Sequence, residues 1–217
     1  MGNRERIIEE SLRLMNEYGT QSIGTTQVSE SLGISPGNLY YHFKNKEEIV
    51  RALFERLEIE IRAVIAEDVV PPISTARFVN FYQRSMGVAW KYRFFFGGLL
   101  HLLRKDAELS QKYRDLQAWA VENLENISKQ LVKDKNMRKP RGTNGYASLA
   151  LNTWLIWSNW IRHIQISSPT HNIEKMDMVS GLIQIFDILS PYLDTEFERS
   201  ARAVLSRNSV TKSKKDV

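Results

Sequence analysis

Residues 25–48 contain two short helical patterns separated by a glycine, and this arrangement restricts the possible folds more than any other feature of the chain. The first pattern, over 25–32, has apolar residues four positions apart, and Gly33 suits the left-handed turn that ends a helix. Ser35 is a favourable N-cap and Pro36 falls at the first helical position, so a second helix follows at once. Two short helices joined by a turn of about three or four residues that contains glycine form a helix-turn-helix.

The second helix of this unit has one apolar face and other faces suited to close contact. Leu39 and Phe43 are four residues apart, so they share a face that we expect to be buried. Gly37, Asn38 and Tyr41 lie on other faces and are polar, aromatic or without a side chain. In a helix-turn-helix, the second helix lies in the major groove of DNA with its N-terminal residues nearest the base edges. The pattern therefore predicts a DNA-recognition helix.

Two kinds of DNA contact are expected from this unit. Gly37, Asn38 and Tyr41 should face base edges, where asparagine can pair with adenine, and Gln27 is a further candidate. Other polar side chains should contact phosphates, which sets the register and carries little sequence information. Each of these residues could instead be ordinary exposed surface. The phosphate candidates are Tyr40, His42 and Lys46 with Thr25 and Thr26, and the start of the second helix, Ser35 and Pro36, completes the predicted DNA-binding set.

The same region matches a known domain at many positions in register. The matching residues are Ile7, Ser11, Tyr18-Gly19, Thr25-Thr26, Val28, Gly33-Ile34-Ser35, Leu39-Tyr40, His42-Phe43 and Lys46-Glu47. On these residues, the stretch from about 4 to 48 resembles the N-terminal helix-turn-helix domain of the TetR family of bacterial transcriptional repressors. Ser11 and Ser29 stand where that family often has alanine. The resemblance implies a dimeric DNA-binding regulator whose larger helical half senses a small molecule.

Composition argues against several other classes of protein. The chain of 217 residues has no cysteine, so we expect no disulfide framework and no thiolate metal site. Charged residues interrupt the N-terminus, and no apolar run reaches about eighteen residues, so we expect neither a signal peptide nor a membrane span. A cytoplasmic protein is therefore predicted. The four histidines form no carboxylate–histidine motif at metal spacing, so we predict neither an enzyme nor a metal or cofactor site.

Charge is distributed unevenly along the chain. The net charge is +5, yet residues 1–50 hold five Lys or Arg and seven Glu, so the predicted DNA-binding domain is not basic overall. Such a domain depends on a few well-placed contacts, doubled by dimerisation, more than on general attraction to phosphate. Residues 199–217 hold six Lys or Arg and one Asp. We expect a basic, disordered and solvated tail over 207–217, and auxiliary phosphate contact is the alternative.

Helical periodicity continues to the end of the chain without a convincing strand pattern, so the expected fold class is all-α. We expect a helix-turn-helix domain over 1–48, a connecting helix over 47–66 and a helical sensor and dimerisation domain over 67–206. The prolines near 69–72 mark the boundary. Further helices are expected over 3–18, 74–92, 107–132, 146–166, 175–193 and 195–206, with a strongly apolar run over 94–103.

The helices expected over 146–166 and 175–193 are apolar on more faces than one core requires. Burial against a second copy would remove that surface from water at roughly 25 cal/mol per Å². A two-fold dimer also suits DNA, since two recognition helices about 34–36 Å apart meet successive major-groove faces of a near-palindromic site. We therefore predict a homodimer through these two helices. The alternative is that both lie inside one bundle.

Aromatic residues gather in the second half of the chain. Pockets for small molecules are mostly apolar with a few polar groups, and they often lie between helices. The same residues could instead form the hydrophobic core. The resemblance favours a pocket for a small hydrophobic or amphipathic effector. The candidate pocket residues are Trp90, Phe94, Phe95, His101, Trp119, Trp154 and Trp157.

The resulting hypothesis is a ligand-responsive repressor that binds a palindromic operator as a dimer, where repression is what the resemblance implies. The ligand would favour a sensor shape in which the recognition helices no longer match the groove spacing. The connecting helix over 47–66 would be the lever, because it joins both halves. The alternative is a helical regulator that no longer senses a small molecule and acts through protein partners.

Overall fold

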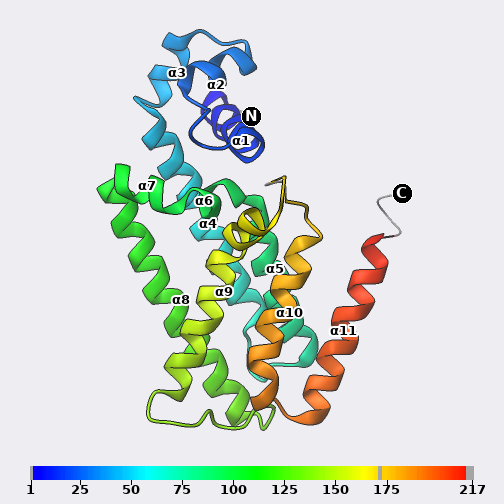
Figure 1. Cartoon of the computed structure of the whole chain (residues 1–217). Helices are drawn as coiled ribbons and strands as arrows, with labels where there is room; N and C mark the ends of the chain where they lie inside the picture. Colours follow the sequence, from blue (N-terminus) through cyan, green and yellow to red (C-terminus); the bar gives the residue numbers. More distant parts are fainter. Residues whose placement is uncertain (1, 171–172, 214–217) are drawn as a thin grey trace.

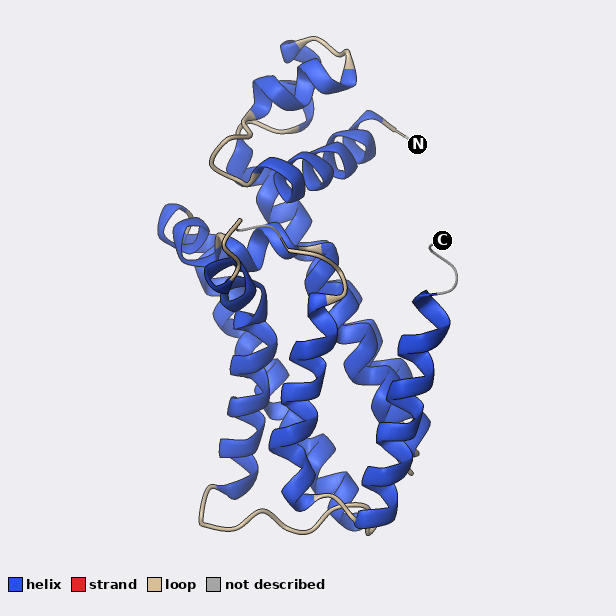
Figure 2. Ribbon diagram, turned by 45° about the vertical axis from the view of Figure 1, so that its right-hand side comes forward, coloured by secondary structure: helices blue, strands red, loops and turns tan. Residues whose placement is uncertain are grey.

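A computed structural model describes residues 2–170 and 173–213 of the chain. Within these residues the secondary structure is helical and no strand is formed, which confirms the predicted all-α class (Figure 1, Figure 2). The helices are α1 (Asn3–Tyr18), α2 (Thr25–Leu32), α3 (Pro36–His42), α4 (Lys46–Asp68), α5 (Thr75–Lys91), α6 (Arg93–Gly97), α7 (Leu99–Lys105), α8 (Ala107–Lys133), α9 (Gly145–Ser167), α10 (Asp177–Leu189), the 3-10 turn η1 (Ser190–Tyr192) and α11 (Thr195–Ser213).

Helices α1, α2 and α3 form a small cluster at one end of the molecule (Figure 1). Ile7 of α1, Val28 of α2 and Leu39 of α3 are buried in its core, and Phe43 closes the core after α3 ends. The predicted spans 3–18 and 25–32 are confirmed by α1 and α2. Helix α4 starts in this cluster and continues into the larger half, where it packs along α5.

The chain turns back after α4 at the predicted break near 69–72. Asp68, the last residue of α4, is buried, and its carboxylate accepts hydrogen bonds from Asn80 Nδ2 at 2.7 Å and Arg84 Nη1 at 2.9 Å. Ser74 then caps α5, because its Oγ accepts from the backbone N–H of Arg77 at 3.4 Å. The hydrogen bonds from Asn80 and Arg84 to Asp68 hold α4 and α5 as an antiparallel pair.

The apolar run over 94–103 forms two short helices, α6 and α7, joined at Gly97 and Gly98. Phe95 and Phe96 of α6 are fully buried. A Cβ at Gly97 would lie 2.8 Å from Gln165 Oε1, so this glycine permits close approach of α6 to α9. The aromatic residues of α6 therefore belong to the core of the larger half.

Helices α5, α8, α9 and α10 build that larger half (Figure 1, Figure 2). Trp157 of α9 donates from Nε1 to the carbonyl oxygen of Ser85 on α5 at 3.0 Å, and its ring meets Phe96 edge to face at 5.0 Å. Trp160 donates from Nε1 to the carbonyl oxygen of Asp177 at 3.0 Å, which ties the start of α10 to α9. Tryptophan is thus used here both for apolar packing and for hydrogen bonding.

The C-terminal end differs in two ways from the predicted spans. Helix α10 ends at Leu189, short of 193, because Pro191 falls in the following 3-10 turn. Helix α11 packs on α5 and continues to Ser213, so the chain remains helical beyond 206, over the first part of the expected disordered tail. The rest of that tail, 214–217, lies outside the described residues. Among the helices of the described residues, none is both long and apolar enough to cross a membrane.

Candidate functional site

The predicted recognition helix, α3, is defined at both ends by local contacts. Ser35 Oγ accepts a hydrogen bond from the backbone N–H of Asn38 at 3.2 Å, with Pro36 at the first helical position. Gly33, with φ of 63°, supplies the left-handed turn between α2 and α3. Leu39 is buried, as the sequence predicts, and anchors the opposite face of α3 to the core.

The outward face of α3 carries the residues predicted to meet base edges. Gly37, Asn38 and Tyr41 are exposed, and the side chain of Tyr41 has a relative exposure of 85%. The Oδ1 atom of Asn38 accepts from Nδ2 of Asn3, at the start of α1, at 3.3 Å. Sequence reasoning missed Asn3, since nothing in its local pattern indicates that the N-terminus of α1 lies beside α3.

The predicted phosphate contacts surround this face. Thr25 Oγ1 and the hydroxyl of Tyr40 lie 3.3 Å apart, which brings the start of α2 beside α3. Thr26 and Tyr40 are exposed, whereas His42 is half-buried with its ring 5.1 Å from that of Tyr41. The structure therefore brings Thr25 beside Tyr40 and His42 beside Tyr41.

Two residues of the predicted set have side chains engaged within the domain. Gln27 Oε1 accepts from the backbone N–H of Gly24 at 2.9 Å, so its amide group caps α2. The ammonium group of Lys46 donates to the carbonyl oxygen of Thr20. Burial lowers the pKa of Lys46, and the positive charge of Lys105 lowers that pKa further. The Nε2 group of Gln27 and the remaining donors of the Lys46 ammonium group are not used in these two contacts.

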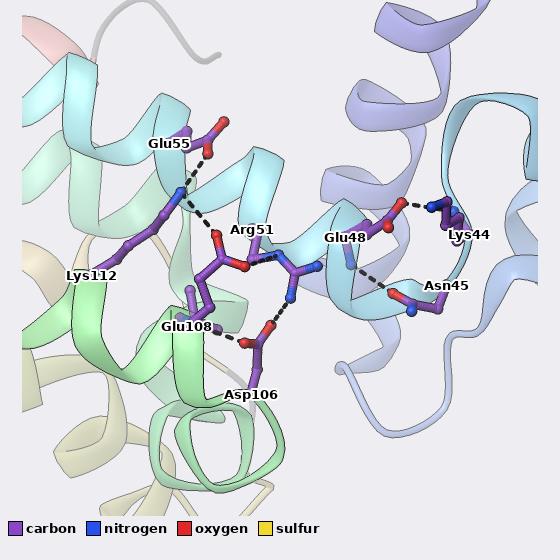
Figure 3. Close-up of polar contacts among 9 residues, drawn as sticks. Lys44, Asn45, Glu48, Arg51, Glu55, Asp106, Glu108 and Lys112 are labelled. Atoms are coloured by element: carbon purple, nitrogen blue, oxygen red, sulfur yellow. Dashed lines mark hydrogen bonds and ion pairs between the residues drawn. The ribbon is translucent and has the colours of Figure 1, made fainter.

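The turn after α3 is stabilised by a reciprocal pair of contacts. Asn45 Oδ1 accepts from the backbone N–H of Glu48 at 2.9 Å, and Glu48 Oε2 accepts from the backbone N–H of Lys44 at 2.8 Å (Figure 3). These contacts cap α4 with an asparagine and place acidic residues in its first turn. They fix the direction in which α4 leaves the recognition helix.

An ion-pair network joins α4 to the first turn of α8 (Figure 3). The buried carboxylate of Asp106 accepts from Arg51 Nη1 at 2.6 Å through Oδ2 and caps α8 through Oδ1, which accepts from the backbone N–H of Leu109 at 3.0 Å. Glu108 lies 3.4 Å from Arg51 Nε, at the exposed edge of the network. One carboxylate therefore fixes both the start of α8 and its attachment to α4.

A second connection runs from α1 to the break between α5 and α6. Asn16 Nδ2 donates to the carbonyl oxygen of Lys91 at 2.8 Å, and Asn16 Oδ1 accepts from the backbone N–H of Phe94 at 3.0 Å. The two backbone groups lie at helix ends, where no partner within the same helix is available. The N-terminal cluster is thus attached to the larger half by both α1 and α4.

An apolar cavity of about 30 Å³ lies among α4, α5, α8, α9 and α10. Trp154 and Trp157, from the predicted pocket set, line it. The other lining residues, which sequence reasoning did not single out, come from several helices, and only their helical spacing on each apolar face could have indicated them. They are Ile61, Ile65, Phe81, Tyr82, Ser85, Ala120, Leu124, Thr153 and Ile185.

The remaining five pocket candidates lie elsewhere. Phe94 and Phe95 are buried in the core around α6. Trp90 stacks with the guanidinium of Arg93 and Trp119 with that of Arg62, at 4.4 and 4.1 Å, and both rings are partly exposed. His101 lines a separate small cavity at the junction of α4 with α7, together with Lys46 and Lys105.

The outward faces of α9 and α10 carry exposed aliphatic side chains. Leu151 and Leu155 lie one helical turn apart on α9, with relative exposures of 42% and 46%, and Ile183 of α10 is exposed at 39%. The inner faces of both helices are buried in the bundle. This split accounts for the excess of apolar residues noted in the sequence, since one face serves the core and another remains open.

Two family models match the chain. One, described as "Bacterial regulatory proteins, tetR family", matches residues 7–53. The other, described as "Bacterial transcriptional repressor", matches residues 45–200 and so spans most of the larger half. The two matches overlap over residues 45–53, at the start of α4, the helix that joins the two parts of the molecule.

Individual transcriptional regulators are also similar to this chain. The tetracycline repressor protein class D of Escherichia coli is 43% identical over 61 residues, 28% of this chain and 26% of that repressor, so the match spans about a quarter of its length. The regulator AcrR of Shigella flexneri is 22% identical over 170 residues, 70% of this chain and 78% of AcrR. The crystal structure of a TetR-family transcriptional regulator from Marinobacter aquaeolei VT8 has a TM-score of 0.84 at 28% identity, and the alignment covers 95% of this chain and 98% of that one.

Proposed function

Because the chain belongs to the TetR family of bacterial transcriptional regulators, we propose that it is a ligand-responsive repressor that binds a near-palindromic operator as a homodimer. The family assignment made from residues 4–48 is confirmed, and with it the general prediction of a DNA-binding transcriptional regulator. Members of this family bind DNA operators, usually act as dimers and are generally not enzymes. The particular residues, interface and effector given below are the parts of the proposal specific to this chain.

The observation that carries the proposal is the outward face of α3. Gly37, Asn38 and Tyr41 are exposed side by side on a helix whose other face is anchored in the core. This is the geometry required for a helix that enters the major groove with its N-terminal residues toward the bases. Asn38 and Tyr41 are the base-reading candidates, while Thr25, Thr26 and Tyr40 lie where phosphate contacts would set the register.

The open face of α9 and α10 supports the homodimer. Leu151, Leu155 and Ile183 expose aliphatic surface on the two helices named from the sequence. Self-association across a two-fold axis would cover these side chains with the same residues of a second copy. That arrangement would place two copies of α3 on one side of the dimer.

The apolar cavity supports control by a small effector. Ile61 and Ile65 of α4 form part of its wall, so a ligand larger than the cavity would displace the helix that carries the DNA-binding end. The volume of about 30 Å³ is far below that of ordinary ligand pockets and holds about two waters. This size also favours the alternative of a regulator without a small-molecule effector, which acts through protein partners.

The test is selection of bound duplexes from a random DNA pool with the intact protein at near-physiological salt. The proposal predicts a palindromic consensus with half-sites about 10–10.5 bp apart, centre to centre, or a multiple of that spacing. Recovery of no preferred sequence by protein that mass spectrometry finds free of bound small molecules would contradict it.

The dimer is tested by charge substitution on the open face. Leu155→Arg should convert the dimer to a monomer in sedimentation and weaken operator binding by at least tenfold, because a buried unpaired charge opposes association. Leu100→Arg is the matched control, since Leu100 is an exposed leucine on α7, outside the open face. A dimer that survives Leu155→Arg would place the interface elsewhere.

A further inference from the structure

The wall of the cavity among α4, α5, α8, α9 and α10 carries no charged side chain in the part of the chain that the structure describes. Its polar members are Tyr82 and Ser85 on α5, and Thr153 with the indoles of Trp154 and Trp157 on α9. A ligand held here is therefore surrounded almost entirely by aliphatic and aromatic groups. An ion moved from water into such a site loses its hydration and gains no counter-charge, at an effective cost of several kcal/mol.

Three of the five polar groups already use their hydrogens within the protein. Ser85 Oγ donates to the carbonyl oxygen of Tyr82 at 2.9 Å, and Thr153 Oγ1 donates to that of Leu149 at 2.9 Å. Trp157 Nε1 donates to the carbonyl oxygen of Ser85 at 3.0 Å. None of these three groups has a free donor for a ligand.

Tyr82 and Trp154 differ from these three, since no hydrogen bond of the Tyr82 hydroxyl or the Trp154 indole is recorded within the described residues. The side chain of Tyr82 is buried, with a relative exposure of 4%, and its ring packs against Phe78, Phe81 and Phe186 at centroid separations of 5.1, 4.7 and 6.0 Å. Burial alone raises the pKa of the Tyr82 hydroxyl, so it stays protonated and able to donate. A ligand oxygen that accepts from this hydroxyl would add a hydrogen bond with a net contribution of roughly 0.5–1.5 kcal/mol.

We propose that Tyr82 is the polar anchor of the cavity, and that the effector is a small, neutral, mainly apolar molecule with one oxygen that accepts a hydrogen bond from the Tyr82 hydroxyl. This inference rests on the proposed function, because it names the ligand class of the same sensor. It excludes carboxylates and ammonium compounds, which the wall cannot neutralise. Entry of a ligand of this kind requires lining side chains to move, since the cavity itself holds about two waters.

The experiment uses three probes built on one ring: ethylbenzene, acetophenone and benzoate. Binding of each probe to the full-length protein, without DNA, is measured by titration calorimetry. Acetophenone should bind roughly tenfold more tightly than ethylbenzene, because only the ketone oxygen pairs with the buried hydroxyl. Benzoate should show no binding. The order of the three affinities is the first readout.

The second readout is the variant Tyr82→Phe, which keeps the ring and removes the hydroxyl. It should bind ethylbenzene and acetophenone with equal affinity. Tyr113→Phe is the matched control, because Tyr113 is a buried tyrosine of α8 outside the cavity wall. Removal of the Tyr113 hydroxyl should leave the tenfold preference intact. The inference is overturned if Tyr82→Phe keeps the preference or if Tyr113→Phe loses it. It is also overturned if benzoate binds most tightly, or if no probe binds to the wild-type protein.

These outcomes are separate from failure of the proposed function. Selection of a palindromic operator by the protein without ligand tests DNA recognition and does not involve the cavity. A protein that selects an operator and yet shows no acetophenone preference would remain a DNA-binding regulator without the anchor. A protein that shows the preference and selects no operator would retain the anchored cavity and lose the proposed regulatory role.

Discussion

The DNA-binding end and the sensor are both built from helices, yet their defining contacts reach very different distances along the chain. Between α2 and α4, the turns are stabilised by residues close in sequence. The side chains of Ser35 and Asn45 each accept a hydrogen bond from the backbone N–H three residues later, which caps α3 and α4. In the sensor, the decisive contacts join distant segments, such as Trp157 with Ser85 and Arg51 with Asp106. The turns of the DNA-binding end are therefore defined by short-range capping. The sensor is defined by packing between helices that are far apart in the sequence.

The largest expected effect is the difference in stability between a substitution in the core of the DNA-binding end and one on its exposed face. Phe43→Ala should lower the free energy of unfolding of this end by about 3–5 kcal/mol, because it leaves a cavity in a small core. Tyr41→Ala should change stability by less than about 0.5 kcal/mol, since its side chain lies in solvent. Urea unfolding followed by circular dichroism measures both. Equal losses would show that the outward face is structural.

The next effect concerns the junction between the two regions. Asp106→Asn keeps a cap for α8 and removes the charged partner of Arg51, so it should cost about 2 kcal/mol. Asp106→Ala also removes the cap and should cost about 1 kcal/mol more. Thermal unfolding of both variants gives the difference. Glu108→Gln is the control at the exposed edge of the network and should be nearly neutral.

A smaller effect tests local capping directly. Ser35→Ala removes the acceptor for the backbone N–H of Asn38 and should lower stability by about 1 kcal/mol, while Ser35→Asp should keep most of it. Hydrogen exchange of the amides of α3 reports the change where it occurs. If Ser35→Ala leaves the exchange of these amides unaltered, packing of Leu39 and Phe43 defines α3 without the cap.

The smallest effect is a pH dependence within the DNA-binding end. A hydrogen bond from Arg13, opposed in part by burial and aided by Ser31, holds the pKa of Glu10 below its ordinary value near 4.5. A carboxyl whose pKa is lowered by folding contributes stability above its unfolded pKa, and this is lost as the pH falls through the folded pKa. Glu10→Gln should therefore lower stability at pH 7 by less than about 1 kcal/mol. Below pH 4.5 the wild type and the variant should converge, which denaturant titrations at several pH values would show.

The same contrast explains what the sequence could predict. The spans of α1 and α2, the caps at Ser35 and Asn45 and the burial of Leu39 follow from residues within a few positions of one another. Helix spans in the sensor were also predictable, because their apolar spacing is regular. The end of α11 was not predictable, because the charges after residue 206 indicated a solvated tail. The backbone instead continues as a helix to Ser213.

Contacts between distant helices left no local signal. Two tryptophans of the predicted pocket, Trp154 and Trp157, line the cavity, while Trp90 and Trp119 stack with arginines near the surface. Composition could identify aromatic residues as a group and could not assign each to core, cavity or surface. Tyr82 was not singled out from the sequence, because its importance depends on the missing partner of its hydroxyl.

The most direct measurement of the central claim is duplex selection repeated with Asn38→Ala, beside the wild type. If the outward face of α3 reads bases, the wild type selects a palindrome. The variant should then keep the half-site spacing and lose preference at one matching position in each half-site. That loss corresponds to roughly 1–3 kcal/mol per base contact. An identical consensus from both proteins would contradict the claim that this face reads the operator.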